Sequence, residues 1–186
     1  MSLLELVEWL ADTPGSIAIR ESMHMYTILE SVHVWALALF VGFAVLLDLR
    51  LLGWALRELP VSATAQRLLP WTIAGFVVMI ISGALLFYAI PVRTYQSIFF
   101  RFKLLLLVLA GLNAAVFHTT IWRRVAEWDL DALTPRRARI AGALSLVLWT
   151  CIIFSGRMIA YNWFDCDRQP QPAIVNWAAG CVIQTE

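Results

Sequence analysis

Four long apolar stretches dominate the chain, and a short polar connection follows each of the first three. They cover residues 31–47, 68–90, 104–122 and 140–163. A helix needs about 20 mostly apolar residues to cross the roughly 30 Å hydrocarbon core of a bilayer. The pattern therefore predicts an all-α membrane protein. Because the connections are short, the four transmembrane helices are expected to form an up-down bundle.

The first residues predict a shorter helix, over 2–12, that lies on the membrane surface. Apolar residues recur there at helical spacing, with acidic residues roughly opposite: Leu3, Leu4, Val7 and Leu10 against Glu5, Glu8 and Asp12. Pro14 and Gly15 should end this helix, and Ser16 is expected to cap the next one. We predict a four-helix domain over residues 1–164, followed by a tail over residues 165–186.

The second apolar stretch carries two further signals. Pro70 is expected in the first turn of its helix, which should stop before Pro91. Gly75, Met79 and Gly83 recur four residues apart on one face, so another helix, or a flat cofactor, could approach closely. Helix packing is the favoured interpretation of this stripe.

Composition and charge narrow the class of protein and suggest how the chain is oriented in the membrane. The 186 residues are 61% hydrophobic and 15% charged, with mean hydropathy +0.75. The net charge of +1 leaves no basic surface for nucleic acid. The first and third connections carry eight basic residues against five on the opposite side. This bias predicts a bacterial inner-membrane protein with both termini in the periplasm.

Two cysteines flank the tail. A periplasmic tail would let Cys166 and Cys181 form a disulfide, although either could instead stay free or pair with a partner protein. Cys151 lies within the fourth apolar stretch and is interpreted as a small buried residue.

Ionisable residues inside the spans are the candidates for chemistry, because charges in hydrocarbon are costly. Lys103 and Asp48 lie at helix ends, where their side chains are expected to reach water. The remaining candidates are Glu30, His33, His118 and Arg157. Histidine inside a membrane bundle is a common axial ligand of haem b, and an arginine can pair with a haem propionate. Gly42, Gly75, Gly83 and Gly111 could make room for the haem face.

Depth argues against one haem held by both histidines. His33 and His118 differ in height by roughly 16 Å before helix tilt. One or two haems are therefore expected, with Met158 as the candidate partner of His33 and no second ligand found in this chain for His118. Glu30 lies one turn from His33 and is expected to orient its ring. A quinone site at Glu30, His33 and Arg157 is a weaker possibility.

These residues leave several functions open. We favour a cytochrome b-like electron-transfer or anchor subunit that works beside other membrane or periplasmic redox subunits, or as a homo-oligomer. A cofactor-free structural or assembly subunit is the main alternative. A proton or small-solute transporter that uses Glu30 and His33 is less favoured, because broken helices and inverted repeats are not visible.

Several of these motifs resemble those of a known family of small bacterial four-helix membrane proteins that has no assigned function. The shared features are the Glu30 and His33 pair, the stretch LDLRLLG (47–53), Lys103, and AGLNAAVFH (110–118), which ends in His118. The resemblance covers about residues 5–160 and excludes the cysteine-flanked tail. It implies the four-helix architecture and marks His33 and His118, without supplying a chemistry.

Overall fold

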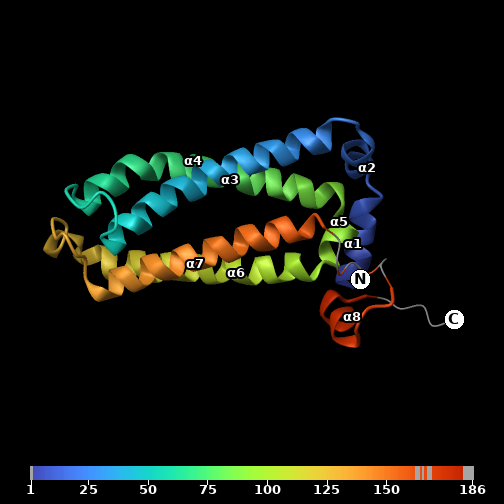
Figure 1. Ribbon diagram of the computed structural model, residues 1–186. Helices are drawn as coiled ribbons and strands as arrows, with labels where there is room; N and C mark the ends of the chain where they lie inside the picture. Colours follow the sequence, from blue (N-terminus) through green and yellow to red (C-terminus); the bar gives the residue numbers. More distant parts are fainter. Residues whose placement is uncertain (1, 162–163, 165, 167–168, 182–186) are drawn as a thin grey trace.

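Two long helical hairpins form the body of the molecule in the computed structural model (Figure 1). The first hairpin pairs α3, Met25–Leu52, with α4, Val61–Ala89. The second pairs α6, Ile98–Val116, with α7, Arg136–Ile159. The structure describes residues 2–161, 164, 166 and 169–181.

The predicted architecture of an all-α, multi-pass membrane protein is confirmed. Among the described residues, four helices are long and apolar enough to cross a membrane: Met25–Leu52, Val61–Ala89, Ile98–Glu127 and Arg136–Ile159. Large apolar side chains such as Trp35 and Val108 are exposed on their outer faces. These outward faces suit the interior of a bilayer, because lipid tails are equally apolar.

Close helix contacts stabilise each hairpin and also join the two hairpins to each other. In the first hairpin, a Cβ atom placed on Gly75 would lie 2.9 Å from the backbone nitrogen of Phe40. The stripe at Gly75 therefore serves helix packing, as the sequence favoured. Between the hairpins, the rings of Phe40 and Trp149 meet edge to face, with centroids 4.7 Å apart. Further along, a Cβ atom on Gly142 would lie 3.2 Å from the carbonyl oxygen of Asp48.

Both described ends of the chain lie at one end of the bundle, which we call the tail end (right in Figure 1). It comprises four short helices: α1, Leu3–Ala11; α2, Pro14–Glu21; α5, Pro91–Tyr95; and α8, Ala173–Ala179. The predicted first helix is present, and a capping box between Ser2 and Glu5 starts it. The expectation that Ser16 caps a long first span is wrong. Ser16 is buried and donates to the carbonyl of Ala89 at 3.4 Å, and the chain breaks again before α3 begins.

The tail is held by contacts of Arg101, which the sequence did not indicate, and by a disulfide, which was one of the alternatives predicted for its two cysteines. Arg101 of α6 donates to the carbonyl of Ala178, in the last turn of α8, at 2.8 Å. Its guanidinium also lies 4.9 Å from the centre of the Tyr95 ring. Cys166 and Cys181 form a disulfide with an S–S distance of 2.05 Å. Cys151 is half-buried and has a free thiol.

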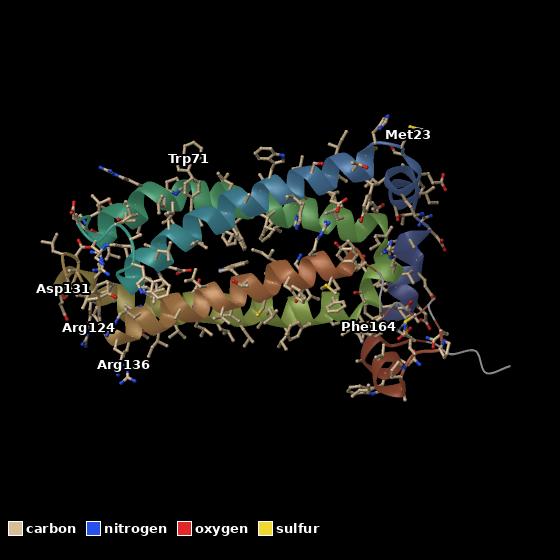
Figure 2. All side chains as sticks on the ribbon, viewed as in Figure 1. Met23, Trp71, Arg124, Asp131, Arg136 and Phe164 are labelled. Atoms are coloured by element: carbon tan, nitrogen blue, oxygen red, sulfur yellow. A yellow bond between two sulfur atoms is a disulfide. The ribbon has the colours of Figure 1, made fainter. Side chains whose placement is uncertain are left out.

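The opposite end, which we call the arginine end, consists of the connections 53–60 and 122–135. Figure 2 places Arg124, Asp131 and Arg136 there. Asp129 accepts hydrogen bonds from the backbone nitrogen and the hydroxyl of Ser62, at 2.7 and 2.6 Å. These bonds satisfy the first turn of α4, which therefore begins at Val61. The expectation that the helix starts at Pro70 is wrong, because Pro70 lies inside α4.

Candidate functional site: a four-helix layer around His33

Residues from all four long helices meet at the level of His33, between the hairpins. We call this set of residues the His33 layer: His33 of α3, Ser82 and Gly83 of α4, Lys103 of α6, and Gly156 of α7. The contacts of Phe40 with Trp149 and of Asp48 with Gly142 fix the antiparallel register of α3 and α7. This register brings His33 level with Gly156. The layer lies about 12 Å from the start of α3 at the tail end.

The His33 ring is hydrogen-bonded to α4 through Nδ1. Nδ1 of His33 lies 3.0 Å from Oγ of Ser82. The Ser82 hydroxyl itself donates to the carbonyl of Val78 at 2.7 Å. In the tautomer in which Ser82 keeps this bond, its single proton is used, so Ser82 accepts from Nδ1–H; the backbone of Met79 is a further hydrogen-bond partner of the ring. Nε2 of the neutral ring then carries an unshared lone pair that can bind a metal ion or accept a proton.

The two glycines of the layer lie where side chains from other helices approach. A Cβ atom on Gly83 would lie 3.1 Å from Cε1 of His33, so the imidazole packs against the backbone of α4. A Cβ atom on Gly156 would lie 3.5 Å from Nζ of Lys103. In contrast, nothing lies within 4 Å of a Cβ atom on Gly42 or Gly111. Gly42 and Gly111 are exposed, so any room that they make for a cofactor lies on the outer face of the bundle.

Lys103 supplies a positive charge to the layer. Its side chain is half-buried and turns toward α7, and its charge acts on the His33 ring. Among the described residues, Lys103 has no hydrogen-bond or ion-pair partner. Since the side chain is only half-buried, access of Lys103 to water stays a prediction. An unpaired ammonium inside an apolar bundle is costly and favours binding of an anionic or electron-rich group beside it.

Glu30 and Arg157 lie outside the layer. Glu30 is exposed and acts electrostatically on Tyr26, and the hydrogen-bond partner of His33 is Ser82 rather than Glu30. Arg157 is exposed, with its guanidinium 5.4 Å from the centre of the Tyr161 ring. The expectation of a buried arginine is wrong, because Arg157 lies in the last turn of α7 and its long side chain extends outward.

Met158 is buried inside the bundle, whereas the side chain of His118 is exposed. Met158 is 7% exposed and lies two residues beyond Gly156, on the buried side of α7. His118 is exposed in a single π-helical turn, η1, Phe117–Ile121, which continues α6 toward the arginine end. A 3₁₀ segment, η2, Trp122–Glu127, follows it. His33 and His118 thus lie in opposite halves of the bundle, as the depth argument predicted.

Ser82 and Gly156 were not predicted from the sequence as part of a site. A serine beside a glycine in an otherwise apolar stretch was the available signal for Ser82, since buried hydroxyls in such helices usually bond to backbone or to another helix. No comparable signal marks Gly156, because its role depends on where Lys103 places its ammonium group.

Sequence comparison gives the family. Residues 8–162 match DUF6644, a family of unknown function. The chain belongs to this family. The match spans all four long helices and the complete His33 layer, and it ends before Cys166 and α8. It confirms the resemblance drawn from the sequence. No curated protein and no solved structure matches the chain.

Proposed function

We propose that this protein is a redox subunit of the bacterial inner membrane that binds one haem b through Nε2 of His33. The observation that carries this proposal is the hydrogen bond between His33 Nδ1 and Ser82 Oγ; in the tautomer in which Nδ1 donates, Nε2 is unprotonated. Axial histidines of haem proteins are held in the same way, with one nitrogen on iron and the other donating to a fixed acceptor. In this proposal both termini lie in the periplasm.

The other residues of the layer fit the needs of such a group. The unpaired ammonium of Lys103 would be a partner for a propionate, in place of the role that the sequence suggested for Arg157. Gly83 and Gly156 present backbone without side chains beside His33 and Lys103. Met158 is buried near this level and is the candidate second iron ligand. Bound haem would supply a one-electron couple between ferric and ferrous iron.

One haem is favoured over two. His118 is exposed, so it could bind iron only where another protein or a second copy of the chain covers it. Glu30 and Arg157 lie toward the tail end, where a quinone or a periplasmic redox partner would approach the layer. These partners remain proposals that follow from the position of the layer.

The absorption spectrum of the purified protein, oxidised and then reduced with dithionite, tests the proposal. We expect a Soret band and a pyridine haemochrome that give about one haem per chain. His33→Ala should lose the haem, whereas His118→Ala, the matched control, should retain it. A haem-free protein from cells with ample haem, or a haem that survives His33→Ala, would contradict the proposal.

A cofactor-free structural subunit is the second candidate. It is favoured by the way the His33 ring packs on Gly83 and bonds to Ser82, because this contact joins α3 to α4 without any ligand. In this case the spectrum would show no haem. His33→Ala would then lower only the free energy of unfolding, by about 1–3 kcal/mol for a lost buried hydrogen-bond partner.

A further inference from the structure

Asp48 is a buried carboxyl group in the other half of the bundle, and the proposed haem site does not use it. It lies in α3, four residues before the helix ends at Leu52, and its side chain is 7% exposed. Its Oδ2 atom is buried and has no hydrogen-bond partner. The expectation that Asp48 reaches water at the helix end is therefore wrong.

The packing around Asp48 contains one polar partner from another helix. The hydroxyl of Ser145 of α7 faces the carboxyl group. The backbone of Asp48 also lies close to Gly142, where an added Cβ atom would be 3.2 Å from the Asp48 carbonyl oxygen. Helices α3 and α7 are therefore in close contact here.

The charged groups near Asp48 are engaged elsewhere or point outward. On α3, Arg50 donates to the carbonyls of Leu59 and Asp131, at 2.8 and 3.2 Å, and its Nη1 atom is buried without a hydrogen bond to Asp48 or to any other group that the structure describes. In the connection that follows α6, Asp129 is bound to Ser62. The basic residues nearest on α4 and α7 are exposed: Arg67, Arg136, Arg137 and Arg139. Among the described residues, no cation therefore neutralises Asp48.

We propose that Asp48 is a proton-binding site that exchanges its proton with water at the arginine end. An ionised carboxylate without a cation in an apolar interior is costly, whereas the neutral acid is tolerated. Ser145 can accept a hydrogen bond from the acid or donate one to the carboxylate, so both forms of Asp48 have a partner. The end of α3 is about 6 Å away, which is a short path to water.

A proton fits this site better than a sodium ion. The oxygen ligands that the described side chains offer are the Asp48 carboxyl group and the Ser145 hydroxyl. Hard cations bound by oxygen take about six ligands or retain several waters. The proposal is independent of haem binding at His33.

Dicyclohexylcarbodiimide, which modifies protonated carboxyl groups in apolar surroundings, tests the proposal on the full chain in detergent micelles. Mass spectrometry of the peptide that contains Asp48 gives the fraction modified. We expect modification of Asp48 to fall as the pH is raised, because the carboxyl group releases its proton. Asp48→Asn should lose the adduct, and Glu30→Gln, the control at an exposed carboxyl, should keep it.

Three results would overturn the proposal: no modification of Asp48, modification that is the same at every pH, or protection by sodium ions at constant pH. The second would indicate a permanently neutral structural group, and the third a cation site. The wild-type infrared band of a protonated carboxyl gives a second readout if Asp48→Asn does not fold. That band should shift in D₂O, and a band that never exchanges would contradict the proposal.

Discussion

A single methyl group added at Gly75 should weaken the first hairpin. A Cβ atom there would lie 2.9 Å from the nitrogen of Phe40, and 3.2 Å from both the Ala36 oxygen and the Phe40 Cα. All three are backbone atoms of α3, so no side chain can rotate away to relieve the contact. We therefore expect Gly75→Ala to move α3 and α4 apart.

The free-energy cost of the clash can be isolated by comparing a matched pair of variants. Restoring ordinary contact distances requires a helix displacement of about 0.5 Å, and overpacking of this kind typically costs about 1–3 kcal/mol. Alanine also favours a helix over glycine by about 1 kcal/mol. Gly42→Ala makes the same exchange within α3, but nothing lies within 4 Å of its added Cβ atom. Comparing the two variants cancels the helix preference and isolates the clash.

The assay is reversible unfolding of the purified protein by SDS in mixed micelles, followed by circular dichroism. We expect Gly75→Ala to be less stable than Gly42→Ala by about 1–3 kcal/mol, which is about 5- to 150-fold in the unfolding equilibrium. If the two variants unfold at the same SDS fraction, the close approach of α3 and α4 at Gly75 is not what holds the hairpin together.

Three further predictions concern the site and the tail. Ser82→Ala removes the hydrogen-bond partner of His33 and should lower the free energy of unfolding by about 0.5–1.5 kcal/mol, with Ser82→Thr losing less in the same titration. Arg101→Gln removes the guanidinium that holds α8, so limited proteolysis should cut the tail faster without changing the SDS midpoint of the bundle. Reducing agent should slow the wild-type protein on a denaturing gel by opening the disulfide, whereas Cys166→Ser should migrate identically with and without reductant.

The spans could be predicted from the sequence because hydrocarbon imposes the same requirement on every crossing segment. Their ends were less predictable where distant residues decide them. Helix α4 begins nine residues before Pro70, at Val61, because Asp129 accepts hydrogen bonds from Ser62 across the arginine end. That contact joins residues 67 positions apart in the sequence, and no local pattern reveals it.

His33, at the centre of the candidate site, could be predicted from the sequence, but the residues around it could not. His33 stood out because an imidazole inside an apolar stretch is unusual. The contact of Lys103 with Gly156 was not predictable, because a long side chain near a helix start can reach outward or inward and the sequence does not choose between them. The position of Gly156 beside Lys103 depends on the register of α3, α6 and α7, which arises from packing of the two hairpins.

The two buried polar sites on α3 should behave independently. His33 and Asp48 are fifteen residues apart, about 22 Å along the helix, and the Phe40 and Trp149 rings lie between them. Stability changes at sites this far apart usually add to within about 0.3–0.5 kcal/mol. The double variant His33→Ala, Asp48→Asn should therefore lose the sum of the single losses in the SDS titration. A larger deviation would show that the two sites are coupled. Both sites would then bias the same structural change, a movement of α3 against α7.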